Sequence, residues 1–331
     1  MKSEWPVVGL EKVNATAYLM VSMKSFLVED DDSISVNWGE GRLSTFELIP
    51  QDSGMNVLWN YTLEGYRIFS YPCVSNGHVY VAVTGSPNVH EHSELIEITP
   101  DGRIREIAEL EEFVLKVARM SDGTLILTGF DVKTGTGKVV LIKGTKKIFE
   151  RSMGNRVLGS LVHDLDGDGA EDFIVAGVVF ENHTKSIISV FLNRSGSFVE
   201  DGRFELLNEN IWGIILAKFE GEEAILLYGP KSIYLLDLSD ASVAKLYEAK
   251  EGYYLTPVEV DDSDGDGQDE VFAVIHNETG NFFTGLEYVN GRMQEKIEFP
   301  LNAKAFSILS LGSRSFLLGS SDGLYLLRLP E

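Results

Sequence analysis

A short apolar segment that ends in or near glycine recurs along the whole of this 331-residue chain. The final glycines of the first five copies are 46, 44, 48 and 52 residues apart, and the last copy's glycine follows after a further 90 residues, which is two periods. Such a period is typical of four-stranded propeller blades, whereas helical repeats tend to be shorter. The copies lie at residues 35–39, 79–85, 124–129, 173–177, 224–229, 271–275 and 315–319.

Each period also contains four strand-like segments rich in Val, Ile, Leu, Phe and Tyr, separated by Gly, Asn, Asp and Ser turns. No segment shows a sustained helical spacing of apolar residues. The pattern therefore predicts an all-β fold, a seven-bladed β-propeller of four-stranded blades that occupies residues 1–331 as a single domain. In the fourth, fifth and sixth periods the predicted strands are 157–163, 173–180, 186–193 and 197–206; 214–219, 224–228, 232–238 and 243–249; and 255–260, 271–276, 283–289 and 293–299.

The two ends of the chain suggest how such a propeller would close. The seventh period supplies only three strands, the last at residues 323–329, and an extra strand at residues 6–13 precedes the first strand of the first period, residues 16–24. We expect this N-terminal strand to complete the last blade, because closure removes the open sheet edges that invite aggregation.

Two nine-residue loops, 164–172 and 262–270, place carboxylates at positions 1, 3, 5 and 9. A hard divalent cation takes about six to eight oxygen ligands, and alternating side chains on a tight loop converge on one point. The backbone carbonyl at position 7 adds a ligand, and glycine at position 6 permits the sharp reversal. We expect each loop to bind one calcium ion. The predicted ligands are Asp164, Asp166, Asp168, Ala170 and Asp172 in the first loop, and Asp262, Asp264, Asp266, Gln268 and Glu270 in the second.

These loops are not EF-hands, and their alternative interpretation is an acidic turn without metal. An EF-hand needs a bidentate glutamate at position 12, where this chain has Val175 and Ala273. Clustered carboxylates repel one another when no cation is present, which favours the metal. Because the loops supply the ligands themselves, a structural ion is favoured over a catalytic one, which keeps open positions for water and substrate.

At these loops the chain resembles the FG-GAP or VCBS repeat family, whose propellers include the head of integrin α subunits. In that family a D-x-D-x-D-G-x-x-D/E loop joins the first and second strands of a blade, and both loops here precede a strand, at 173–175 and 271–273. The resemblance implies that the four carboxylates of each loop bind one calcium ion. It covers two blades, since Phe219-Glu220-Gly221-Glu222-Glu223 and Met120-Ser121-Asp122-Gly123 lack the pattern, and the Phe-Gly and Gly-Ala-Pro signatures are absent.

Charge and composition exclude several classes of function. The chain has 51 acidic and 28 basic residues, a formal net charge of −23, and such a surface repels nucleic acid and anionic lipid. No apolar run reaches the roughly 18 residues of a membrane-spanning helix. Cys73 is the only cysteine, so an internal disulfide and a cysteine-based zinc site are both excluded. We therefore expect neither nucleic-acid binding nor membrane insertion.

The compartment is indicated by two weaker features. The N-terminus lacks the apolar region of a signal peptide, so the protein is either intracellular or has lost its signal. Calcium loops of millimolar affinity fill outside the cell, and five glycosylation sequons point the same way, so we expect an extracellular or cell-surface protein. The sequons begin at Asn14, Asn60, Asn182, Asn193 and Asn277.

Aromatic and cationic residues precede or begin the first strands of successive blades. In a propeller these positions share the face opposite the calcium loops, where they suit a sugar or an acidic peptide. The alternative is that the rings pack between blades. The residues of this candidate ligand face are Tyr66, Arg67, Arg156, Trp212, Tyr253, Tyr254 and Lys304.

Three functions fit these observations. The first is a calcium-stabilised binding or adhesion scaffold for a protein or glycan, and it is favoured because no catalytic constellation competes with it; a Gly-x-Ser-x-Gly elbow, for example, is absent. The second is a lyase or hydrolase acting on polysaccharide, with paired carboxylates at the mouth of the channel. The third is a subunit of an intracellular assembly. Fold alone does not choose among them.

Overall fold

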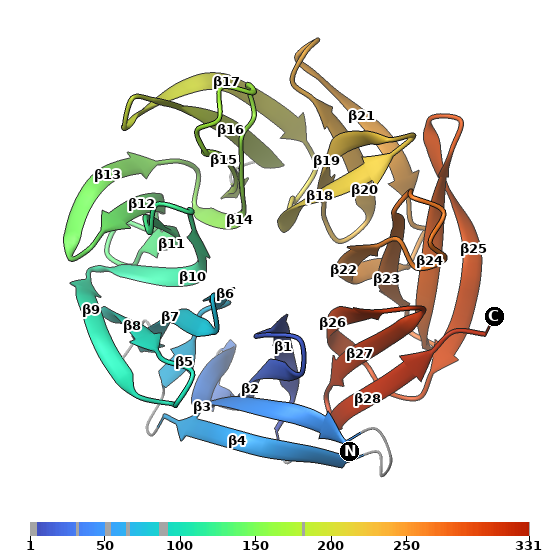
Figure 1. Cartoon of the computed structure of the whole chain (residues 1–331), viewed down its shortest axis with the longest axis horizontal. Helices are drawn as coiled ribbons and strands as arrows, with labels where there is room; N and C mark the ends of the chain where they lie inside the picture. The colour runs from blue at the N-terminus through green and yellow to red at the C-terminus, as the bar shows by residue number, and fades with distance from the viewer. Residues whose placement is uncertain are drawn as a thin grey trace. The chain divides into compact units, whose positions relative to one another are not determined.

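A computed structural model of the chain describes residues 5–30, 33–49, 54–63, 67–85, 92–180 and 183–330. The described residues are built from strands, turns and bends, as the repeat predicts. The strands form seven antiparallel sheets, drawn in sequence colours in Figure 1, and these divide between two compact units, Met1–Val157 and Leu158–Glu331. The single-domain prediction for residues 1–331 stays a prediction.

The first unit contains three sheets. The first and third have the orders β1-β2-β3-β4 and β10-β11-β12-β13. The second has the order β5-β7-β8-β9, and β6 also pairs with β7, so β5 and β6 share the place of one strand. The bounds are β1 (Val7–Lys12), β2 (Ala17–Asp30), β3 (Ser33–Ile49), β4 (Gly54–Thr62), β5 (Arg67–Phe69), β6 (Cys73–Ser75), β7 (His78–Gly85), β8 (Ser93–Ile98), β9 (Ile104–Leu110), β10 (Glu112–Arg119), β11 (Leu125–Asp131), β12 (Gly137–Lys143) and β13 (Lys146–Ser152).

The second unit contains four sheets with the orders β14-β15-β16-β17, β18-β19-β20-β21, β22-β23-β24-β25 and β26-β27-β28. The bounds are β14 (Arg156–His163), β15 (Asp172–Phe180), β16 (Thr184–Arg194), β17 (Ser197–Leu207), β18 (Gly213–Phe219), β19 (Glu222–Tyr228), β20 (Ser232–Asp237), β21 (Ser242–Glu248), β22 (Tyr254–Asp261), β23 (Glu270–His276), β24 (Asn281–Val289), β25 (Arg292–Leu301), β26 (Ala305–Gly312), β27 (Ser315–Ser320) and β28 (Gly323–Arg328).

Within each unit, neighbouring sheets bury their faces against each other. Val81 and Ala82 are adjacent in β7 and therefore point to opposite faces of their sheet. Val81 packs in a cluster with the first sheet, and Ala82 packs in a cluster with the third. In the second unit, the ring of Phe272 in β23 lies 4.4 Å from that of Phe316 in β27. Because both faces of the middle strands are buried, these strands are apolar throughout rather than alternating.

Two of the recurring glycines have a steric cause in this arrangement. A Cβ atom on Gly129 in β11 would collide with the backbone carbonyl oxygen of Phe113 in β10, where the register between the two strands shifts. A Cβ on Gly229, directly after β19, would collide with the carbonyl oxygen of Asn210. A residue without a side chain is therefore needed where this strand meets its inner neighbour.

The predicted closure by the N-terminal strand is wrong. β1 pairs with β2 in the first sheet, with Leu10 opposite Met20, and the last described sheet ends with β28 as its third strand. The segment expected as the first strand of the first blade is therefore its second strand. A short connection explains the pairing: the backbone amides of Val13 and Asn14 donate to the carbonyl of Ala17, and closing so short a loop costs little chain entropy.

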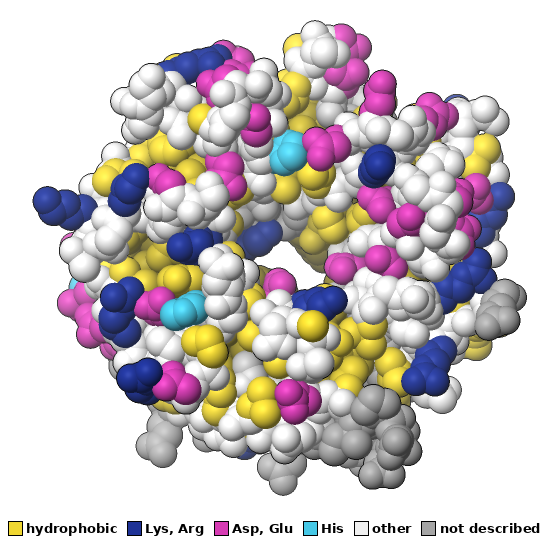
Figure 2. Space-filling view, viewed as in Figure 1, with side chains coloured by type: hydrophobic (Ala, Val, Ile, Leu, Met, Phe, Trp, Pro, Cys, Tyr) yellow, Lys and Arg dark blue, Asp and Glu magenta, His cyan; other side chains and the backbone are white. Residues whose placement is uncertain are grey.

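Charged side chains are dispersed on the face of the molecule in Figure 2. Acidic side chains are scattered over it, Lys and Arg side chains lie among them, and apolar side chains are visible between the two kinds. No basic stripe of the kind that follows a nucleic-acid backbone is visible on that face.

Candidate metal sites and ligand face

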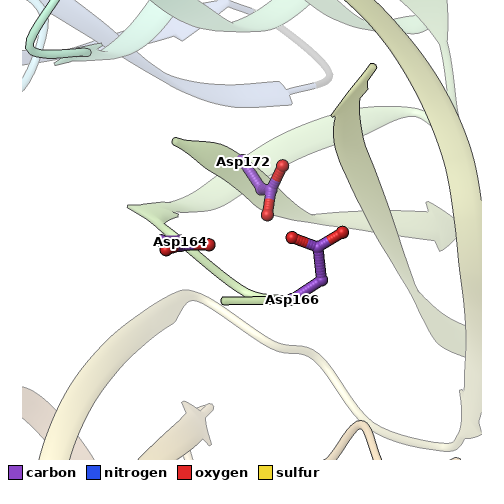
Figure 3. Close-up of side chains that lie close together, drawn as sticks. All are labelled: Asp164, Asp166 and Asp172. Carbon is purple, nitrogen blue, oxygen red and sulfur yellow. The ribbon is translucent and has the colours of Figure 1, made fainter. Parts of the chain in front are cut away.

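The first acidic loop connects β14 to β15 in the fourth sheet. Carboxylate oxygens of Asp164, Asp166 and Asp172 lie within 4.8 Å of one another, and Figure 3 shows the three side chains converging on one space. Two oxygens on opposite sides of one calcium ion are about 5 Å apart, given ligand distances of about 2.3–2.6 Å. The three side chains therefore fit a shared ion.

The second loop, between β22 and β23, repeats this arrangement in the sixth sheet. Oxygens of Asp262, Asp264 and Asp266 also lie within 4.8 Å of one another. In both loops the two oxygens of the first aspartate accept the backbone amides at positions 4 and 6, which are glycines. The two loops thus share one backbone conformation although they belong to different sheets.

Glycines at positions 4 and 6 make this conformation accessible. Gly167 and Gly169 have φ of 75° and 87°, and Gly265 and Gly267 have φ of 78° and 89°, in the left-handed region that favours glycine. The reversal that they permit turns successive carboxylates inward. This agrees with the expectation that position 6 needs a glycine.

The remaining predicted carboxylates are engaged differently in the two loops. Asp168 accepts the amide of Ala170 and does not join the group of three in the first loop. Glu270 does not join the group in the second loop, since its Oε2 accepts the amide and the hydroxyl of Ser263. Its counterpart Asp172 accepts the amide of Leu165 in the same way. In both loops, the carboxylate at position 9 therefore accepts a hydrogen bond from the residue at position 2.

A basic side chain reaches the first loop. The guanidinium of Arg194, at the end of β16, lies 2.5 Å from Oδ2 of Asp166 and 3.8 Å from Oδ2 of Asp168. In the third sheet, the ammonium of Lys143 similarly lies 2.7 Å from Asp122 in the turn between β10 and β11. A basic side chain thus pairs with a carboxylate in both the first acidic loop and the β10–β11 turn. The β10–β11 turn lacks the metal motif. Sequence reasoning missed both partners, because each comes from the far end of a neighbouring hairpin.

No basic side chain forms an ion pair with the second loop among the described residues. Desolvation raises the pKa of Glu270, and the charges of Asp264 and Asp266 raise it further. Desolvation also raises the pKa of Asp269, with Asp262 acting in the same direction. Uncompensated negative charge is what a bound cation would relieve.

The second loop is also hydrogen-bonded to the neighbouring sheet. The amide of Lys218 in β18 donates to Asp269 at 2.6 Å, and the amide of Asp269 donates back to the carbonyl of Lys218 at 2.8 Å. The amide of Glu220 donates to the side chain of Gln268 at 3.2 Å. These bonds attach the loop to the β18–β19 hairpin, which occupies the equivalent place in the fifth sheet and lacks the metal motif.

The candidate ligand face is only partly assembled in the structure. Tyr66 lies outside the described residues, and Arg67 begins β5 with a side chain that is not described. The boundary between the units falls within β14, so Arg156 belongs to the first unit; its guanidinium lies 3.5 Å from the centroid of the Phe130 ring, within that unit. In the second unit, Tyr253 is partly buried against the core, as the packing alternative expects.

Two residues of this face, Tyr254 and Lys304, both interact with His276. Tyr254 is 42% exposed at the start of β22, and its ring lies 5.7 Å from that of His276 and 5.6 Å from the ammonium of Lys231. The pKa of His276 is lowered by desolvation and by the nearby charge of Lys304. Trp212 is 37% exposed ahead of β18. Tyr254 and the second acidic loop lie at opposite ends of β22, about 23 Å apart at roughly 3.3 Å per residue.

Sheets that pack face to face and run in sequence order define a β-propeller, and known structures support this class. No protein-family model and no curated protein matches the chain. Among solved structures it is similar to a chain of a mitotic checkpoint complex, with a TM-score of 0.65 and 10% identity, covering 100% of this chain and 91% of that one.

Two further structures are similar over nearly the whole chain. A putative 6-phosphogluconolactonase from Bacteroides uniformis has a TM-score of 0.64 and 11% identity, covering 96% of this chain and 92% of that one. The β-propeller domain of the Trilobed protease from Pyrococcus furiosus, described as having an open velcro topology, has a TM-score of 0.57 and 10% identity, covering 98% and 94%. At this identity the similarity shows the fold alone.

The described residues include no helix that is long and apolar enough to cross a membrane.

Proposed function

We propose that the protein is a calcium-stabilised binding scaffold for a protein or glycan partner. The observation that carries the metal part is that each loop brings three aspartates within 4.8 Å of one another in one shared backbone conformation. The propeller fold supports a binding role, since its short turns and strand ends present many side chains on a stiff framework.

Each ion would be held by the aspartates at positions 1, 3 and 5 or 9 and by backbone carbonyls. Bound calcium supplies positive charge that relieves repulsion among carboxylates and joins positions distant in the loop. Hydrogen bonds within the chain hold the second loop as well. Ser263 donates to Glu270, and Asp269 accepts the amide of Lys218 in β18. We therefore infer a structural role for the metal.

The partner would bind where aromatic and cationic side chains meet at the strand end remote from the loops. Lys231, Tyr254, His276 and Lys304 are linked there by ring contacts and electrostatic interaction. An exposed ring beside an ammonium group suits the face of a sugar or an acidic peptide. An extracellular or surface location would be consistent with this role, and two sequon asparagines, Asn14 and Asn60, are exposed.

Calorimetric melting of the chain with EDTA and after calcium back-titration tests the metal role. We expect calcium to raise the melting temperature with a stoichiometry of two ions per chain, and Asp164→Asn combined with Asp262→Asn to remove most of the rise. Asp240→Asn with Glu251→Gln, in exposed turns outside both loops, is the charge-matched control. Binding in the millimolar range would support an extracellular location. An unchanged melting curve together with no calcium by elemental analysis would refute the proposal.

A further inference from the structure

A cleft of about 590 Å³ lies beside the first acidic loop, entirely within the second unit. Residues from the end of β14, from the β18–β19 hairpin, from β20 and from β24 line it. Its volume is in the range of about 300–1,000 Å³ that is usual for ligand sites. None of the residues predicted for the ligand face lines this cleft.

Part of the cleft wall is apolar. Leu216, Ile225 and Leu235 contribute partly buried side chains from three neighbouring strands. Phe219 and Tyr288 stack with ring centroids 4.6 Å apart and an interplanar angle of 14°, which adds a paired aromatic surface to this wall. Such a surface can receive the hydrocarbon part of a ligand.

The charged groups of the cleft are nearly all acidic. Its lining includes no lysine or arginine, and His163 is its one basic residue. Five carboxylates line it: Asp164, Glu220, Glu222, Glu223 and Asp237.

Two of these carboxylates have no partner in the described part of the chain. Glu223 is paired with His163 at 2.8 Å, and Asp237 accepts bonds from Ser239. In contrast, no described side chain donates to the exposed carboxylates of Glu220 and Glu222. Glu220 lies in the turn between β18 and β19 and Glu222 begins β19, so they are the groups left to meet an incoming cation.

The β18–β19 turn is held in place from its other side. The amide of Glu220 is bonded to Gln268 and that of Lys218 to Asp269, both in the second acidic loop. Glu220 itself has a φ of 53°, a conformation that a glutamate keeps only when its surroundings hold it. These contacts therefore hold the β18–β19 turn in one conformation at the cleft.

We propose that this cleft binds a peptide segment carrying arginine or lysine next to apolar residues. The aliphatic stems and apolar neighbours would lie on the wall formed by Leu216, Ile225 and Tyr288, and the cationic heads would meet Glu220 and Glu222. Charge complementarity selects this occupant, because the lining offers acceptors and almost no cation of its own. The inference rests on the proposed scaffold function and names a class of partner for it, at a second site.

Calorimetric titration with a blocked Leu-Arg-Leu-Arg tetrapeptide tests this proposal, with saturating calcium and about 150 mM salt to screen distant charges. We expect binding of the arginine peptide and at least a severalfold weaker response to the same peptide with citrulline in place of arginine. Glu220→Gln with Glu222→Gln should weaken binding about tenfold, as expected for two partly exposed charge pairs.

The matched control is Glu251→Gln with Glu278→Gln, which removes the same charge from exposed turns elsewhere in the second unit. This control should leave the affinity unchanged. Equal losses in both double variants would show general attraction to an acidic protein, and no loss in Glu220→Gln with Glu222→Gln would place binding elsewhere; either result overturns the proposal. So would equal binding of the two peptides.

Calcium titration and melting of the same variants separate this inference from the proposed metal role. Calcium stabilisation without peptide binding would refute the cleft and leave the metal role standing. Peptide binding that depends on Glu220 and Glu222 without calcium stabilisation would refute the metal role and leave the cleft standing.

Discussion

At Gly129 the backbone of the neighbouring strand leaves no room for a side chain. The register between β10 and β11 shifts after Val114, and the shift brings the carbonyl of Phe113 against the Cα of Gly129. Any side chain there must displace backbone, which a packed sheet resists. The same requirement acts at Gly229 against Asn210, so at two of its positions the recurring glycine is required by the backbone that lies against it.

Gly129→Ala should therefore destabilise the first unit by about 3 kcal/mol, through a clash with backbone that cannot be relieved by rotating a side chain. The control is Gly202→Ala in β17, where the new Cβ meets only side-chain atoms, the nearest at 3.4 Å, and where we expect a change within about 0.5 kcal/mol. Urea unfolding measures both. Equal stability of the two variants would contradict the steric account.

Glu11 gives a prediction for pH. Its side chain reaches solvent, yet the surrounding protein displaces enough water to raise its pKa from 4.5 to about 7, against the opposing charge of Lys116. Because the folded state binds this proton more tightly than the unfolded chain, the stabilising contribution of Glu11 is fully present below pH 4.5 and is lost as the pH rises through about 7.

Melting of the wild type and Glu11→Gln between pH 5 and pH 8 checks this sign. The glutamine variant should gain melting temperature relative to the wild type as the pH rises, because it has no proton to lose. A constant difference between the two proteins across this range would show that Glu11 titrates at its usual pKa.

At the scale of elements, the strands of the fourth, fifth and sixth sheets lie within two residues of their predicted bounds. Turn residues explain this accuracy: Ser195-Gly196 and Asn290-Gly291 both adopt positive φ between predicted strands. The prediction for the first sheet was displaced by one strand. It assumed closure of the ring and did not pair the segments on either side of the short Val13–Ala17 turn. The cleft could not be predicted, since its lining converges from five strands and only tertiary structure brings Glu223 near His163.

The second acidic loop has two separable roles, and two variants distinguish them. Asp269→Ala removes the acceptor for the Lys218 amide and should cost about 1–2 kcal/mol whether calcium or EDTA is present. Asp264→Asn should leave stability in EDTA unchanged or slightly raised, because it reduces carboxylate repulsion, and should weaken calcium binding.

Melting curves in EDTA and in calcium decide between these expectations. If Asp269→Ala destabilised the protein only in calcium, the bond to Lys218 would depend on the ion, and the loop would have one role rather than two.

At the scale of the whole molecule, a formal charge of −23 is carried by a fold whose ion pairs are largely exposed. Exposed pairs contribute little, about 0–1 kcal/mol each, so they offset self-repulsion poorly. A divalent cation can then stabilise this protein in two ways, by filling the acidic loops or by neutralising the surface in general. The two differ in their response to salt, because a surface interaction is screened and a filled site is screened much less.

Melting should therefore be measured as sodium chloride and calcium are varied together. In EDTA, raising sodium chloride from about 20 mM to 0.5 M, where the Debye length falls below about 8 Å, should raise the melting temperature by relieving repulsion. At 0.5 M sodium chloride the rise caused by calcium should persist, while magnesium, which demands shorter ligand distances and keeps its waters, should give much less. A calcium effect that vanished at 0.5 M sodium chloride, or that magnesium reproduced, would mean that charge neutralisation rather than the two aspartate loops stabilises the fold.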